Sequence, residues 1–132
     1  MAKGLDKHQN RLNELSLFGK NLARRARSHC ELCDDSGVKL NIFEVSPIAS
    51  EPDYDSCILL CDTCNEQLNN PKRVDADHWR CLNKSIWSET PIVQAQAIYM
   101  LRQLAEKHDW AADLNDMAYL EADVEARISL IE

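Results

Sequence analysis

Two Cys-x-x-Cys pairs carry the clearest chemistry of this chain: Cys30 with Cys33, and Cys61 with Cys64. Each pair presents two thiolates on one side of a tight turn, so the two turns together supply four ligands for a tetrahedral site. Such a site suits Zn²⁺, although iron bound by four cysteines has the same ligand list. Because four cysteines close the coordination shell, we expect one structural zinc ion.

Two disulfides or a redox Cys-x-x-Cys are the alternatives. A redox motif needs a single pair in a βαβ setting, which the surroundings of Cys30 do not offer. Disulfide frameworks are typical of secreted proteins, whereas residues 1–6 begin no apolar signal segment. No apolar run is long enough to cross a bilayer. We therefore expect a soluble, cytoplasmic protein with no membrane partner.

Charge is distributed unevenly along the chain. The 132 residues have a formal net charge of −7, yet residues 1–30 hold seven basic and two acidic side chains. An acidic bulk repels nucleic acid at long range. The basic segment still offers local phosphate contacts, and the candidates are Arg24, Arg25 and Arg27. The plainer interpretation is a solvated helix face near the negative end of a helix dipole.

The elements around the cysteines follow from apolar spacing. A stripe at three- and four-residue steps predicts a helix over residues 5–27. Alternation over residues 38–45 predicts a half-buried strand, and the apolar residues 57–60 predict a short buried one. Thr63 and Glu66 match a capping box that would begin a helix at Cys64, and residues 69–71 would end it. The first stripe comprises Leu12, Leu15, Phe18, Leu22 and Ala26.

This order of a cysteine turn, two strands and a second turn that opens a helix is typical of a treble clef. With 45% hydrophobic residues and only three glycines, the remaining chain is expected to be helical. The fold class is therefore α+β, mostly α. It would comprise a basic N-terminal helix over residues 1–27, a zinc-bound treble-clef (ββα) module over 28–71 and a helical extension over 72–132.

Four apolar stripes predict the helices of the extension. Asp75 would cap the first of them, and Thr90 the second, with Pro91 at its first position. The last stripe is apolar and needs a surface that covers it. Two alternatives remain open: packing within the chain, or contact with a second copy in a homodimer or with a helical protein partner. In order, the stripes are Trp79, Leu82 and Ile86; Val93, Ala97, Met100, Leu101 and Leu104; Trp110, Leu114 and Met117; and Leu120, Val124, Ile128 and Ile131.

The second cysteine pair resembles that of HNH endonucleases, in Leu59-Leu60-Cys61-Asp62-Thr63-Cys64-Asn65 and in the strand end Phe43-Glu44-Val45-Ser46-Pro47. In that family, histidines at the strand end bind the catalytic metal and supply the general base. Here those positions hold Glu44 and Val45, and the downstream ligand position falls near Gln67 or Leu68. The resemblance thus implies the shape of a nuclease without its catalytic histidines. A divalent-metal-dependent nuclease that uses Glu44 and His78 is the alternative.

The other histidines and cysteines are expected to be structural or solvent-facing. His29 adjoins Cys30 and would line the zinc turn, and Asp77 and His78 are adjacent, so their side chains would point apart on a helix. His8 and His108 lie in charged surroundings. Cys57 and Cys81 lie in apolar surroundings without a partner turn, as buried thiols do.

A second resemblance, over about residues 20–121, is to the bacterial PhnA-type "alkylphosphonate utilisation" proteins. It implies a cytoplasmic bacterial protein with an N-terminal zinc-binding unit, but no established reaction. Longer members carry an SH3-like domain after the helices, so this chain would be a fragment or a short variant. The shared blocks are residues 28–33, 43–47 and 58–64, then Asp77-His78-Trp79-Arg80-Cys81-Leu82-Asn83-Lys84-Ser85-Ile86-Trp87-Ser88 and Trp110-Ala111-Ala112-Asp113-Leu114.

The sequence therefore predicts a zinc-stabilised binding or regulatory protein rather than an enzyme. Phosphonate cleavage would need a metal with open coordination positions, which four cysteines do not leave. Its partners would be nucleic acid at the basic helix or protein at the terminal stripe.

Overall fold

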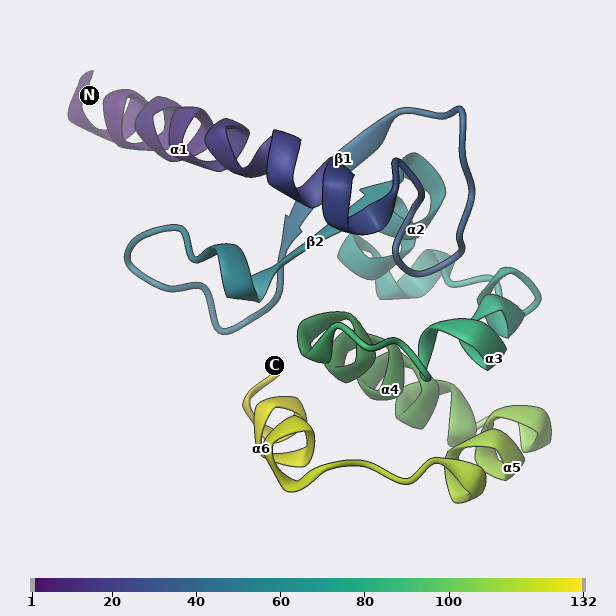
Figure 1. The fold of residues 1–132 in the computed structure, drawn as a ribbon. Helices are drawn as coiled ribbons and strands as arrows, with labels where there is room; N and C mark the ends of the chain where they lie inside the picture. Colours follow the sequence, from purple (N-terminus) through teal and green to yellow (C-terminus); the bar gives the residue numbers. More distant parts are fainter. Residues whose placement is uncertain (1, 132) are drawn as a thin grey trace.

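The protein is mostly helical, with one small two-stranded sheet (Figure 1). A computed structural model describes the backbone of residues 2–131 and the side chains of residues 9–131. The elements are α1 (Ala2–Ala26), β1 (Leu40–Glu44), β2 (Cys57–Cys61), α2 (Asp62–Asn69), α3 (Leu82–Ser85), α4 (Pro91–Ala105), α5 (Asp109–Met117) and α6 (Ala122–Leu130), with the 3₁₀ turns η1 (Tyr54–Ser56), η2 (Pro71–Arg73) and η3 (His78–Cys81).

The sheet is an antiparallel pair in which Leu40 lies opposite Cys61 and Glu44 opposite Cys57. Every residue of β2 is buried, because helices cover both of its faces. Cys57 and Leu59 pack against α1, while Ile58 and Leu60 join the main core. This double burial explains the continuous apolar run that predicted the strand, and that prediction is confirmed.

The expected strand over residues 38–45 is shorter than predicted. β1 covers Leu40–Glu44, and Val38 lies outside it with an exposed side chain. The stripe of α1 is likewise only partly buried: Leu15 and Leu22 pack on the sheet, but Leu12 is 46% exposed. The reason is visible in Figure 1, where the N-terminal half of α1 projects past the end of the sheet.

Helix α4 is the centre of the main core. It contacts α3, α5 and α6, and its predicted stripe is buried throughout. The terminal stripe, for which a partner surface remained open, is buried within the chain: Val124, Ile128 and Ile131 pack into the main core. Arg127 fixes α6 further by donating to the carbonyl oxygen of Ser46 at 2.9 Å. Packing within the chain therefore covers these three residues of the stripe.

Two of the helices predicted for the C-terminal extension differ from the elements that the structure has there. The stripe of Trp79, Leu82 and Ile86 is fully buried, but it lies on η3 and the short α3 rather than on one helix capped by Asp75. Asp75 instead accepts the backbone N–H of Asp77 in a local turn, which competes with helix formation. Met117 ends α5 with its side chain 67% exposed. Among the described residues, no helix is long and apolar enough to cross a membrane.

An ion pair joins α1, the first cysteine turn and β2. The Glu31 side chain is 6% exposed, and its carboxylate accepts hydrogen bonds from Arg25 at 2.6 and 3.0 Å. The same carboxylate accepts the backbone N–H of Leu59 at 2.9 Å. Arg25 also donates to the carbonyl oxygen of Cys57 at 2.9 Å. Glu31 thus holds the turn of Cys30 and Cys33 against the strand that leads to Cys61.

Replacing this carboxylate is expected to destabilise the fold. Glu31→Ala leaves the Arg25 charge and the Leu59 N–H without their partner, so we predict a loss of about 2–3 kcal/mol in the free energy of unfolding. Urea denaturation of the metal-loaded protein measures it. Glu66→Ala, at an exposed position of α2, is the control and should change stability by less than about 0.5 kcal/mol. Equal stability of the two variants would contradict this role of Glu31.

Candidate metal centre

Three elements bring the four predicted ligands together. Cys30 and Cys33 lie in the turn that follows α1, Cys61 is the last residue of β2, and Cys64 lies in the first turn of α2. The chain leaves α1 through two residues with positive φ, Arg27 at 55° and Ser28 at 59°. This left-handed exit ends the helix and directs the following residues toward β2.

The predicted capping box is wrong, because a ligand cysteine takes its place. Cys61 is the N-cap of α2, and its Sγ accepts the backbone N–H of Cys64 at 3.4 Å. A sulfur thus occupies the position that a serine or aspartate oxygen fills in other helices. The turn that gathers the second cysteine pair is therefore also the turn that begins α2, while its predicted end at Asn69 is confirmed.

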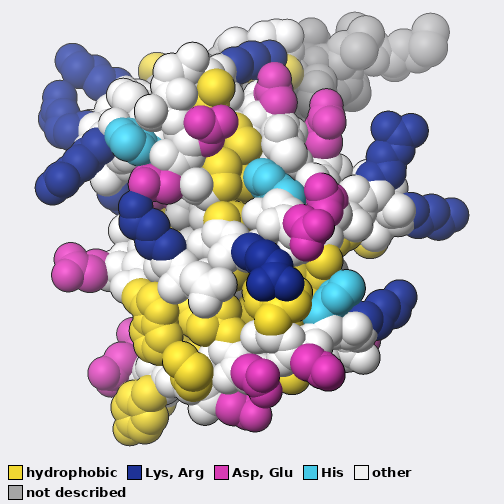
Figure 2. All heavy atoms as spheres, turned by 90° about the vertical axis from the view of Figure 1, so that its right-hand side faces the viewer, with side chains coloured by type: hydrophobic (Ala, Val, Ile, Leu, Met, Phe, Trp, Pro, Cys, Tyr) yellow, Lys and Arg dark blue, Asp and Glu magenta, His cyan; other side chains and the backbone are white. Residues whose placement is uncertain are grey.

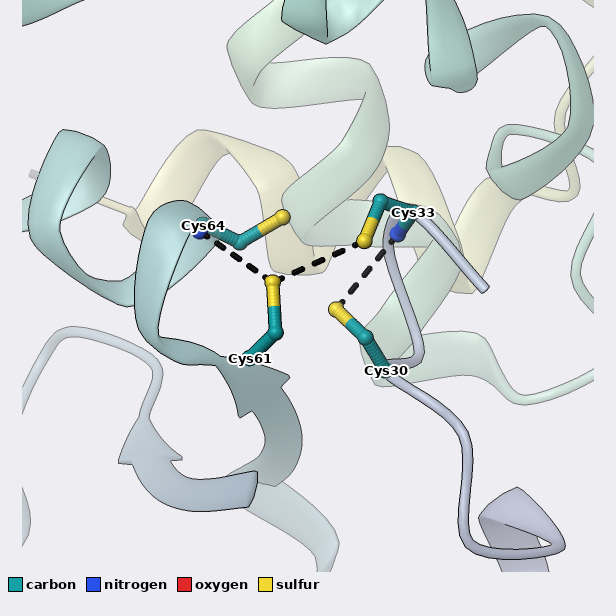
Figure 3. A group of neighbouring side chains, drawn as sticks. All are labelled: Cys30, Cys33, Cys61 and Cys64. Carbon is teal, nitrogen blue, oxygen red and sulfur yellow. Dashed lines mark hydrogen bonds between the residues drawn. The ribbon is translucent and has the colours of Figure 1, made fainter. Parts of the chain in front are cut away.

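The four sulfur atoms point toward one another (Figure 3) and all lie within 4.8 Å. The sulfurs of Cys33 and Cys61 are 3.6 Å apart. A tetrahedral site with Zn–S bonds of about 2.3 Å has S···S edges of about 3.8 Å, so the cluster has the dimensions of a metal cage. Among the described residues it is the one group of His, Cys, Asp or Glu ligands found close enough to hold a metal ion.

All six cysteines are free thiols, so the disulfide alternative does not describe this structure. The cage sulfurs differ in acidity. The pKa of Cys30 is lowered to about 4, chiefly because its sulfur accepts a hydrogen bond from Cys64. The pKa of Cys33 is raised to about 12, first by burial and then by the neighbouring Cys30 charge. A metal ion that binds all four sulfurs must therefore displace protons.

Nitrogen atoms around the cage interact with its sulfurs. The N–H of Cys33 donates to the Sγ of Cys30 at 3.5 Å. The Nε2 of His78, from η3, lies 3.1 Å from the Sγ of Cys64. When Cys64 is a thiolate, the Nε2–H of His78 donates to it and offsets part of its charge.

The sequence did not predict this contact of His78. His78 is the fourteenth residue after Cys64, and no regular spacing connects the two. The histidine reaches the cage because η2 and η3 turn the chain back across α2. Asp77, whose side chain was expected to point away from His78, lies 3.7 Å from Arg80.

The three candidate arginines do not form one surface. Arg24 and Arg27 are exposed, but Arg25 is held by Glu31 and lies over the Tyr54 ring, 5.4 Å from its centroid. Arg25 is therefore a structural residue, contrary to the expectation that it contacts nucleic acid. The exposed cations of α1 instead continue at Lys20, one turn before Arg24.

Glu44, the candidate for a nuclease, has a structural partner. Its carboxylate accepts two hydrogen bonds from Arg11 at 2.5 and 3.0 Å. Arg11 also donates to the carbonyl oxygens of Ala49 and Ser50. Val45 is fully buried, and the Nε2 of His78 contacts the sulfur of Cys64. The structure therefore does not bring Glu44 and His78 together as a catalytic pair.

The remaining candidates lie outside the cage. The Nδ1 of His29 contacts the Asp34 carboxylate at 3.2 Å, and His108 precedes α5 as its N-cap. Burial raises the pKa of Cys57 to about 11 and that of Cys81 to about 12. Both thiols are therefore protonated at neutral pH and are poor nucleophiles. The His8 side chain lies outside the described residues.

The comparisons with known proteins add no assignment. No protein-family model matches the chain, and neither a curated protein nor a solved structure matches it.

The contact between His78 and Cys64 predicts a change in metal affinity. Outer contacts to metal ligands contribute about 10- to 100-fold in affinity, so His78→Phe should weaken zinc binding by that factor. Phenylalanine keeps a ring beside Trp79, which His78 contacts edge-on. Competition with a chromophoric chelator measures the affinity, with His108→Phe as the control. Equal affinity in both variants would show that His78 does not support the site.

Proposed function

We propose that the four cysteines hold one structural Zn²⁺ and that the surrounding unit is a treble clef. The convergence of four sulfurs at the spacing of a tetrahedral site supports this proposal. The order of elements also fits: a cysteine turn, the β1–β2 pair, and a second cysteine turn that begins α2. Zinc is preferred because four thiolates in a closed site are its usual structural ligands. Reduced cysteines fit a reducing compartment such as the cytoplasm.

The function that follows is that of a binding or regulatory module rather than an enzyme. Four cysteine ligands leave no open position where a metal-bound water could be activated. The arginine contacts of Glu44 also oppose a nuclease role, because a general base must reach its substrate. The PhnA-type resemblance, proposed from the sequence blocks, agrees with a zinc-stabilised module of this kind.

Replacing a single ligand tests the structural role of the metal. Cys61→Ser should lose the zinc ion and unfold the sheet and α2, because the binding energy of a structural zinc ion is folding energy. Circular dichroism and elemental analysis of the purified protein measure both effects. Cys81→Ser, which removes a thiol outside the cage, should retain one zinc ion per chain. A Cys61→Ser protein with wild-type zinc content and unfolding would contradict the proposal.

A second candidate function is nucleic-acid binding through α1. Lys20 and Arg24 are exposed one turn apart on the side of α1 opposite Leu15 and Leu22, and the exposed Arg27 follows directly after the end of the helix. Figure 2 shows one face of the molecule, on which Lys and Arg side chains lie at the upper left-hand edge, at the right-hand edge and near the centre, with Asp and Glu between them. Such a local group of cations suits phosphate contacts despite the acidic net charge.

Salt dependence tests this candidate. Three phosphate contacts predict that log K falls with log salt concentration with a slope of about −2.7 for duplex DNA. Replacing Lys20, Arg24 and Arg27 by Gln should abolish the slope in a fluorescence-anisotropy titration. The control replaces Lys39, Arg73 and Lys84 by Gln, which changes the net charge equally but leaves α1 intact. Equal binding by the two triple variants would remove the candidate.

A further inference from the structure

A continuous groove runs between α4 and the α2–η2 segment. It consists of two hollows of about 340 Å³ and about 760 Å³. Both are lined by Pro71, Val74, Met100 and Gln103, so they open into each other. Their volumes fall in the range of small-molecule sites. Neither hollow includes a cysteine of the metal cage.

The smaller hollow is lined by a carboxamide that forms no side-chain hydrogen bond with the described residues. Gln96 of α4 is only 4% exposed and lines this hollow. Among the described residues, no group forms a hydrogen bond with its side chain. The amide atoms of Gln96 are not among the fully enclosed polar atoms, so they are accessible from the hollow that the residue lines. Gln96 therefore offers both a donor and an acceptor to whatever occupies the hollow.

A second carboxamide in the same hollow has a fixed orientation. The Oε1 of Gln67 accepts the N–H of Asp75 at 2.8 Å and the Nε1–H of Trp79 at 2.7 Å. Both partners are donors, so this atom must be the oxygen of the amide. The Nε2 group of Gln67 is then left as a donor. Gln67 and Gln96 approach the hollow from α2 and from α4 respectively.

The rest of the smaller hollow is partly aromatic and nearly uncharged. Phe43 and Tyr99 line it, and aromatic side chains are suited to contact with a flat ligand. Among its described lining residues, Glu44 is the one charged side chain, and Arg11 holds that carboxylate. Amides and aromatic rings without a cation suit a neutral, planar group with hydrogen-bonding edges.

The larger hollow, unlike the smaller one, is lined by several charged side chains. Lys72, Lys107 and His108 line it, together with the carboxylate of Glu106. Neither lysine has an ion-pair partner among the described residues. Cations beside an aromatic and amide-lined hollow match the two parts of a nucleotide, a neutral base and a phosphate.

We propose that this groove binds a nucleotide, with the base between Gln67 and Gln96 and the phosphate near Lys72 and Lys107. Glutamine pairs with the adjacent donor and acceptor of adenine, so an adenine base is the best match. The nucleotide can be free or part of a single strand, because the chemistry is the same. The inference goes beyond the zinc-stabilised module proposed above and uses none of the α1 cations.

The experiment titrates the zinc-loaded protein with AMP, adenosine, ribose 5-phosphate and single-stranded oligo(dA) by isothermal titration calorimetry. AMP should bind more tightly than adenosine, which lacks the phosphate, and than ribose 5-phosphate, which lacks the base. Tighter binding of oligo(dA) than of AMP would identify a strand as the source, and the reverse order a free nucleotide. If neither AMP nor oligo(dA) binds, the proposal is overturned.

Two sets of variants separate the halves of the site. Gln96→Met should weaken AMP and adenosine alike by about fivefold or more, because it removes a paired base contact. Replacing Lys72 and Lys107 by Gln should weaken AMP but leave adenosine unchanged. Wild-type affinity for AMP in either variant would overturn the assignment of that half.

A matched control lies two residues away on the same helix. The Nε2 group of Gln94 donates to the carbonyl oxygen of Ile86 at 2.9 Å, so its amide is already paired. Gln94→Met should lower the melting temperature without changing AMP affinity, whereas Gln96→Met should keep the melting temperature and lose affinity. Because zinc content is measured on each variant, loss of the metal is distinguished from loss of the nucleotide site.

Discussion

The constraint on which the structure depends is the convergence of four sulfur atoms from three separate segments. Four thiolates in one buried place would repel one another, so the sulfur atoms either keep their protons or share a bound cation. The cage closes a loop from the end of α1 to the start of α2. Below this site the sheet has only two strands, which are marginal without such a cross-link.

The cage also positions the rest of the molecule. Both faces of β2 are covered, by α1 on one side and by the main core on the other, so the cysteine cage and the helices are packed as one body. Because α2 begins at Cys61 and Gln67 lies one to two turns later, the wall of the groove opposite α4 is set by the second cysteine turn. A ligand in the groove would therefore rest on a surface whose position depends on the cysteine cage.

The features that depend on residues close together in the sequence could be predicted from it. The cysteine spacing indicated the cage, the apolar run indicated β2, and the stripe around Met100 indicated α4. Contacts between distant residues were not predictable, because no periodicity marks them. The interaction of His78 with Cys64, the pairing of Arg25 with Glu31, and the unpaired amide of Gln96 all arise only when the chain has folded.

The most direct test of this account is native mass spectrometry of the protein purified without added metal. One zinc ion per chain, with the mass of four displaced protons missing from the cysteines, would agree with a closed thiolate site. A metal-free folded chain with six protonated thiols, or a chain whose mass shows paired cysteines, would contradict it. Each of these two contradicting results would remove the basis for treating the cage as the structural centre of the fold.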